Sequence, residues 1–165
     1  DRISKILMKK FPKRGWGSLK KLDKLEDNQI ATYVDNLLEN KITFYINELK
    51  PFINHCIDND ISLYLFSNAP LSWCYPIHEK LKLKYIIPPE NILTSDWKLF
   101  NNRVKPEPKL YTDISKYIEL KEKTNNILLY FIDDSYKNLD PVKHNKKWKT
   151  ILFDDSFNNI MKYIN

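Results

Sequence analysis

The sequence predicts an α/β fold, with helices on both sides of a parallel sheet in a three-layer arrangement. Two uninterrupted apolar runs, 62–66 and 127–132, are bounded by turn residues, as is typical of strands that are covered on both faces. From residue 46 onward, segments with apolar residues at helical spacing alternate with such runs. The 165 residues, 42% of them hydrophobic, suffice for one core and match one ordinary domain in size.

The first 45 residues have a different pattern from the rest. Apolar residues at helical spacing near the start and over 28–40 predict two helices, separated by a lysine-rich turn that holds both glycines of the chain. We therefore predict a small helical segment over 1–45 and an α/β core over 46–165.

The elements of the predicted core follow from apolar spacing and from the turn residues and prolines between them. In chain order they are a helix over 46–57, a strand over 62–66, a helix over 71–83, a short strand over 92–94, a helix that starts near Pro106 and Pro108, strands over 127–132 and 150–153, and a helix from Ser156.

The net charge of +6 has two explanations. Lysine outnumbers arginine 24 to 3 while alanine and glycine are scarce, which indicates AT-rich codon usage that places lysine on solvated faces whatever the function. A basic surface that binds RNA is the alternative, and the lysine-rich, tryptophan-containing stretch 11–24 is its candidate contact.

The two cysteines, Cys56 and Cys74, are too few for a disulfide framework, so we expect an intracellular, reducing compartment, either the cytoplasm or an organelle. Cys74 and His78 would make only half of a metal site, and we expect them to pack in the core. No apolar run approaches the roughly 20 residues of a membrane span. The chain starts at Asp1 rather than Met, which indicates a processed chain or a fragment.

Polar residues stand where the predicted strands end, which is where open α/β sheets bind ligands. Ser67 and Asn68 follow the first long strand, and Asp133 and Asp134 follow the second. Lys105 lies in the loop before a helix. A hydroxyl, a cation and a carboxylate pair suit a phosphate together with Mg²⁺, a cation that prefers oxygen ligands.

This ordered set resembles the haloacid dehalogenase (HAD) superfamily of phosphohydrolases, and its Phe-Ile-Asp-Asp-Ser-x-x-Asn form is similar to that of pyrimidine-nucleotidase-like members. The resemblance covers 46–155 and implies a HAD-like (Rossmannoid) sheet, with 1–45 as a helical cap. It also implies that Ser67, Asn68 and Lys105 hold the phosphoryl group of a phosphorylated small molecule or nucleotide. Asp133 and Asp134 would hold Mg²⁺, with Asp134 as the direct ligand.

The chain departs from that family in its first motif, a strand ending in Asp-x-Asp that supplies the aspartyl nucleophile and the general acid. Its Asp-x-Asp, 58–60, precedes a strand instead. Two functions therefore stay open. The chain is a fragment of a phosphatase, inactive as given, or a non-catalytic, HAD-derived pseudoenzyme that serves as a structural or binding subunit of a protein assembly or ribonucleoprotein.

The missing first strand also has a consequence for packing. In the family arrangement it lies between the strand that ends at Ser67 and the strand that ends at Asp134. Because buried backbone groups require partners, we expect a strand from an upstream segment or a partner chain in that position. The alternative is direct pairing of the two flanking strands.

Overall fold

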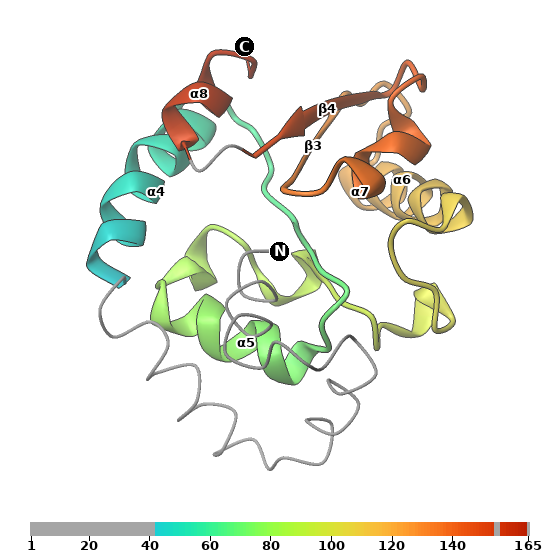
Figure 1. Ribbon diagram of the computed structural model, residues 1–165, viewed down its shortest axis with the longest axis horizontal. Coiled ribbons are helices and arrows are strands. Elements are labelled where there is room, and N and C mark those ends of the chain that lie inside the picture. Colours follow the sequence, from blue (N-terminus) through green and yellow to red (C-terminus); the bar gives the residue numbers. More distant parts are fainter. Residues whose placement is uncertain (1–41, 154–155, 165) are drawn as a thin grey trace.

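The computed structural model describes residues 42–153 and 156–164, and these form a mixed α/β fold (Figure 1). The helices are α4 (Ile42–Asp58), α5 (Leu71–Lys80), α6 (Pro108–Glu122), α7 (Tyr136–Leu139) and α8 (Phe157–Met161). The strands are β1 (Leu65–Phe66), β2 (Ile92–Leu93), β3 (Leu129–Asp133) and β4 (Trp148–Leu152), and short 3-10 turns connect several of these elements.

The strands form two separate parallel pairs rather than the one continuous sheet that the sequence predicts. β1 pairs with β2, with Leu65 opposite Ile92. β3 pairs with β4, with Phe131 opposite Thr150. Direct pairing of the two long apolar runs, one of the two expected outcomes, is therefore wrong. The other outcome, an inserted strand, is not supplied by any of the residues described above and stays a prediction.

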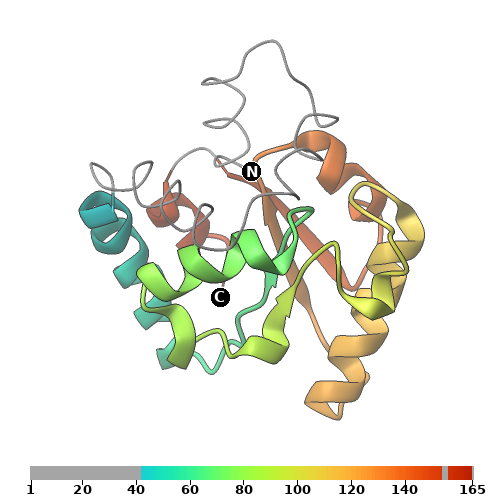
Figure 2. The ribbon, with the colours of Figure 1, turned by 90° about the horizontal axis from the view of Figure 1, so that it is seen from below.

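Helices contact both faces of the strands. On one face, α6 packs through Tyr111 and Ile114 against Phe131 of β3 and Phe66 of β1. On the other face, α4 and α8 contact each other and bury Phe52 and Ile160 beside alternate residues of β3 and β4. Figure 2, seen from below, shows α5 on this side of the molecule, opposite α6. Because both faces are covered, the apolar runs lack the alternation of a half-exposed strand.

The elements occur in the predicted order, with shifted ends. The apolar run 62–66 becomes a strand only at Leu65–Phe66, because only these two residues lie opposite β2. Helix α5 ends at Lys80, and Lys82 then adopts a left-handed conformation with φ of 56°. Pro108 is at the start of α6, where an N–H group would have no partner within the helix, so the missing N–H of proline does not weaken the helix. Ser156 caps α8 by accepting from the Asn159 N–H.

The N-terminal predictions fall largely on residues that are not described. The two helices expected before residue 41 and the candidate RNA contact 11–24 lie outside the described residues. Helix α4 begins at Ile42 and so runs through the predicted boundary at 45/46. The division into a cap and a core stays a prediction.

The remaining expectations concern the cysteines and the membrane. Cys56 and Cys74 are both free thiols and buried. His78 is buried as well and its Nε2 lies 2.7 Å from the Ile87 carbonyl oxygen, which confirms that Cys74 and His78 pack in the core. Within 42–153 and 156–164, every helix is too short or too polar to cross a bilayer.

Candidate functional site

Three segments that are distant in the sequence meet at the carboxyl ends of β1 and β3. The Lys105 side chain lies at their junction, and its Nζ donates to the Phe66 carbonyl oxygen at the end of β1 (3.1 Å). The same atom donates to Oδ2 of Asp133 at the end of β3 (2.7 Å). The structure thus brings together the loop after β1, the loop before α6 and the end of β3, as the sequence predicts.

Asn68 fixes the backbone on which Lys105 is carried. Its Oδ1 accepts from the Lys105 N–H (2.7 Å), and its Nδ2 donates to the Lys105 carbonyl oxygen (3.0 Å). One side-chain amide therefore satisfies both backbone groups of Lys105, as a neighbouring strand would. The peptide bond from Lys105 to Pro106 is cis. In this geometry Asn68 positions Lys105, and the phosphate contact that the resemblance implies for Asn68 stays a prediction.

The Lys105 ammonium lies in an aromatic, largely dry environment. Its side chain is 7% exposed and that of Asp133 is 4% exposed. The ammonium lies 4.7 Å from the centroid of the Phe66 ring and 5.5 Å from that of Phe131. Cation–π attraction of this kind strengthens when water is excluded. A buried charge needs a partner, and Asp133 neutralises this one.

The second oxygen of Asp133 is held by the turn that follows β3. Its Oδ1 accepts from the Ser135 N–H and from Asn138 Nδ2, both at 2.9 Å. Burial opposes ionisation of this carboxyl, but the Lys105 charge and the three donors outweigh burial. The pKa of Asp133 therefore lies below its ordinary value. Asp133 thus joins two segments of the site through three hydrogen bonds.

Ser67 directly follows β1 and is half-buried beside this junction. Its Oγ accepts from the Ala69 N–H (3.1 Å), which is ordinary turn chemistry. Because a hydroxyl has one donor and two lone pairs, this bond leaves the O–H to donate either to the nearby Cys74 sulfur or to a ligand. Cys74 of α5 lies close to Ser67, and burial raises the pKa of the Cys74 thiol to about 11.

The carboxylate pair fits a metal ion only in part. Both oxygens of Asp133 already bind donors of the chain. The direct Mg²⁺ ligand that the resemblance implies is Asp134, which is half-buried and follows β3 immediately. No group of three or more metal-ligating side chains forms among the residues that the structure describes. Mg²⁺ prefers six oxygens, and here water or a ligand would have to supply most of them.

The only Asp-x-Asp sequence lies at the opposite end of β1 from Lys105. Asp58 ends α4, and Asp60 is an exposed turn residue with φ of 53°. Both precede β1 by several residues, so neither carboxylate belongs to the junction of Ser67, Lys105 and Asp133. The described residues therefore place no aspartyl nucleophile at the site.

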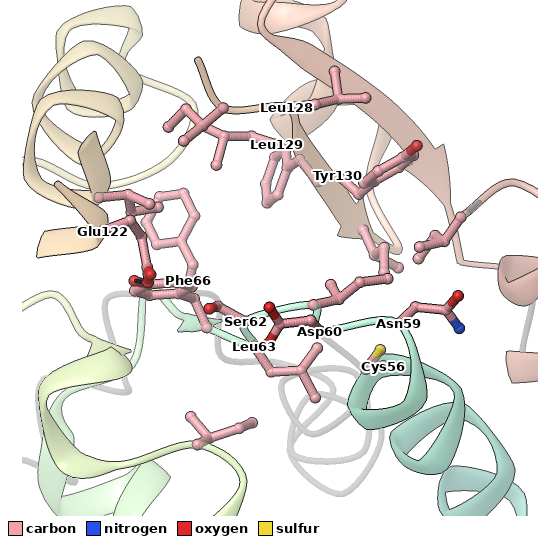
Figure 3. Close-up of a pocket in the computed structure, with 18 of the residues that line it drawn as sticks. Cys56, Asn59, Asp60, Ser62, Leu63, Phe66, Glu122, Leu128, Leu129 and Tyr130 are labelled. Carbon is pink, nitrogen blue, oxygen red and sulfur yellow. Dashed lines mark hydrogen bonds between the residues drawn. The ribbon is translucent and has the colours of Figure 1, made fainter. Parts of the chain in front are cut away.

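A cleft of about 710 Å³ separates β1 from β3 (Figure 3). Figure 3 shows Leu63 and Phe66 along one wall and Leu129 and Tyr130 along the other. Most of the side chains that line this cleft are apolar.

Sequence reasoning missed three features of this region. It quoted Asn138 as part of a motif without recognising it as a partner of Asp133. It read Phe66 and Phe131 as core residues and did not expect them to flank a cation. It also missed that Asn68 holds the Lys105 backbone, because the turn chemistry of asparagine indicates bonds to its own neighbouring backbone and not to a segment 37 residues away.

Comparison of this chain with models of protein families, with curated proteins and with solved structures found no match.

Proposed function

We propose that the junction of Ser67, Lys105 and Asp133 is the phosphate-binding site of a HAD-like phosphohydrolase domain. On this proposal the two parallel pairs belong to one three-layer HAD-like sheet, and residues 1–45 are its helical cap. The chain would be a fragment of a phosphatase whose substrate is a phosphorylated small molecule, with nucleotides as the candidate class.

One observation carries this proposal: a single buried ammonium joins the carboxyl ends of β1 and β3. Lys105 Nζ contacts the last residue of each strand. Ligands of open parallel sheets bind at this edge, and a fixed cation there stabilises phosphoryl charge without reorganising. The Ser67 hydroxyl stands beside it as a hydrogen-bond donor.

The proposal also includes weak binding of Mg²⁺ near the phosphate. Asp134 is the proposed ligand, and the ion would neutralise charge on a bound phosphoryl group. Asp133 supports the site indirectly by holding Lys105 in position. Since one or two carboxylates and water make a poor cage, we expect weak Mg²⁺ binding that Asp134→Asn abolishes and Asp58→Asn, an exposed control, leaves unchanged.

Inorganic phosphate tests the proposal directly. We expect phosphate, added to the isotopically labelled 165-residue chain, to shift the NMR amide signals of Ser67, Asn68 and Lys105. Lys105→Met should abolish the shifts, and Lys109→Met, whose side chain is 64% exposed, should preserve them. Shifts that persist in folded Lys105→Met, or that never appear in the wild-type chain, would contradict the proposal.

The chain alone should not hydrolyse a generic phosphomonoester. Phosphoryl transfer through an aspartyl intermediate needs a nucleophilic carboxylate, and the carboxylate that the described residues bring to Lys105, that of Asp133, is buried and already bound by three donors. We expect no release of p-nitrophenol from p-nitrophenyl phosphate above the rate without protein. Turnover that disappears in Lys105→Met would show that this inference is wrong.

A second candidate function is a non-catalytic subunit that binds RNA, and a basic hollow supports it. A surface hollow of about 520 Å³ at the start of β4 is lined by Lys143, Lys146 and Lys149, together with Tyr163. Among the residues that the structure describes, no acidic side chain lines it. Single strands bind basic grooves with aromatic groups. Binding of a labelled RNA oligonucleotide that weakens with salt and is lost when the three lysines become glutamine would favour this function.

A further inference from the structure

The outer edge of β4, the edge that faces away from β3, has no neighbouring strand among the described residues. β4 pairs with β3 alone, and Figure 1 shows it on the outer side of that pair. The pairing runs from Leu129 opposite Trp148 to Asp133 opposite Leu152. A strand with one neighbour presents a row of N–H and C=O groups to which another polypeptide can bind.

The hydrogen bonds between β3 and β4 show which groups point outward. The Leu129 N–H donates to the Lys147 carbonyl oxygen, and the Phe153 N–H donates to the Asp133 carbonyl oxygen. The odd-numbered residues of β4 therefore face β3. Because backbone groups of successive residues point to opposite edges of a strand, the N–H and C=O groups of Thr150 point outward, as do those of its even-numbered neighbours.

The outward row consists of Trp148, Thr150 and Leu152. The Trp148 N–H already donates to the Asn145 carbonyl oxygen. No other backbone group of this row has a hydrogen-bond partner among the residues that the structure describes. Thr150 and Leu152 are only half-buried, so a partner can approach them. The row thus offers two N–H donors and the carbonyl oxygens between them, which an extended polypeptide matches.

The surface beside this edge is basic. Lys146 and Lys149 are exposed and line the hollow at the start of β4. Neither forms an ion pair with a described residue, whereas Lys143, which also lines the hollow, pairs with Asp140. Two uncompensated positive charges therefore stand next to free backbone groups. Such a surface is complementary to a negatively charged partner.

The two faces of an added strand would meet different surroundings. Trp148 and Leu152 pack in the cluster that α6 covers, whereas Ile151 packs with α4 and α8. Since side chains alternate along a strand, Lys149 is on the same face as Ile151, and both line the basic hollow. A strand added to β4 continues this alternation. Acidic side chains would suit its hollow face, and apolar side chains would suit the other.

We propose that the outer edge of β4 binds an acidic segment of a partner protein in extended conformation, by strand addition. The segment contributes about five residues, matching 148–152, with carboxylates at alternate positions near Lys146 and Lys149. A second copy of β4 would bring its own lysines, and like charges oppose that pairing. RNA would meet the lysines but leave the backbone row unmatched. The proposal depends neither on phosphate binding at Lys105 nor on RNA binding.

Amide exchange in the full chain tests this proposal. The probe is a capped heptapeptide in which glutamates and valines alternate. Without it, we expect the Ile151 amide, which faces β3, to exchange slowly and those of Thr150 and Leu152 to exchange faster. With it in excess, the Thr150 and Leu152 amides should slow by about tenfold or more. A control peptide with lysines in place of the glutamates should leave both rates unchanged.

A matched pair of variants separates strand addition from attraction by charge. Thr150→Pro removes one outward N–H and keeps the hydrogen bonds to β3, as is tolerated at the free side of an edge strand. It should weaken peptide binding by about tenfold or more, whereas Thr150→Ala keeps the N–H and should bind like the wild type. Slow exchange of the Phe131 amide, which faces β4, checks that both variants keep the strand pair.

Peptides with N-methyl groups test the same point in the unaltered chain. Methylation of alternate amides blocks one edge of the peptide, and an added strand uses only one edge. One of the two methylated sets should therefore lose binding and the other should keep it. Equal binding of both sets would mean that only the charges are recognised, and the proposal would be wrong.

Three further results in the unaltered chain would overturn the proposal. One is an RNA oligonucleotide that binds the hollow while the acidic peptide does not bind, which assigns the basic surface to RNA. Another is slow exchange of Thr150 and Leu152 in a monomer without peptide, which means that the chain covers its own edge. The last is the same protection only in a dimer, which means that a second copy occupies the edge.

Discussion

Lys105 and Asp133 are 28 residues apart in the sequence, yet their side chains form an ion pair of 2.7 Å in the interior of the protein. The pair links the loop before α6 to the end of β3. Both side chains are almost fully buried, so each charge depends on the other and on the polar groups around it. This dependence leads to measurable predictions.

Removing one member of the pair should destabilise the protein far more than removing both. Lys105→Met leaves the Asp133 carboxylate buried without its main partner, and Asp133→Asn does the same to the ammonium. We expect each to lower the free energy of unfolding by about 3–5 kcal/mol. The double variant should lose much less than the sum of the two. Urea unfolding measures all three, and additive losses would contradict the coupling.

The pair should also make the free energy of unfolding depend on pH in the acid range. The pKa of Asp133 in the folded state lies below its ordinary value. Its contribution to the free energy of unfolding is therefore complete above the pKa of the unfolded chain, about 3.9, and is lost as the pH falls through the folded pKa. The stability gap between the wild type and Asp133→Asn should be constant from about pH 5 to 7 and narrow below about pH 4. Urea unfolding at each pH measures it, with exposed Asp58→Asn as control. A difference in unfolding free energy that stays constant below about pH 4 would contradict the ionised state assigned to Asp133.

Asn68 should matter for Lys105 even though it carries no charge. Asn68→Ala removes two hydrogen bonds to the Lys105 backbone and leaves those backbone groups with poorer partners. We expect a loss of about 1–3 kcal/mol in unfolding free energy. Phosphate binding should weaken with it if the proposed site is correct. Asn126→Ala, at an exposed position, is the control and should change neither. An unfolding free energy of Asn68→Ala equal to that of the wild type would show that these two hydrogen bonds contribute nothing to stability.

Both cysteines should resist alkylation in the folded protein. Burial raises the pKa of Cys56 and of Cys74 to about 11, so at pH 8 only roughly one thiol in a thousand is the reactive thiolate. We expect slow labelling by iodoacetamide in buffer and rapid labelling of both in urea, measured by mass spectrometry of the peptides. Equal rates in the two conditions would contradict the buried assignment.

The order of elements and the place of the site were predictable because they depend on local signals. Pro108 marks the start of a helix by its missing N–H, and the apolar run before Asp133 indicates a strand covered on both faces. The carboxyl ends of parallel strands meet at one edge, which brings Ser67, Lys105 and Asp133 together without any knowledge of their side-chain conformations. These inferences require only spacing along the chain.

The partners of each site residue were not predictable from such signals. The resemblance implied that Asp133 and Asp134 both hold Mg²⁺, with Asp134 as the direct ligand, but it did not indicate that Asp133 is occupied by Lys105 and Asn138. That assignment depends on distances between segments that the spacing along the chain does not specify. The division into two sheets also arises at long range, since an apolar run such as 62–66 does not reveal which of its edges will find a partner.

The cleft is closed at one end and accessible at the other. Lys105 ties the carboxyl ends of β1 and β3 together, whereas exposed residues such as Asp60 and Glu122 line the opposite end. The two pairs of strands are therefore tied together at their carboxyl ends by a side chain, and a change that releases Lys105 frees both pairs to separate along the whole length of the cleft.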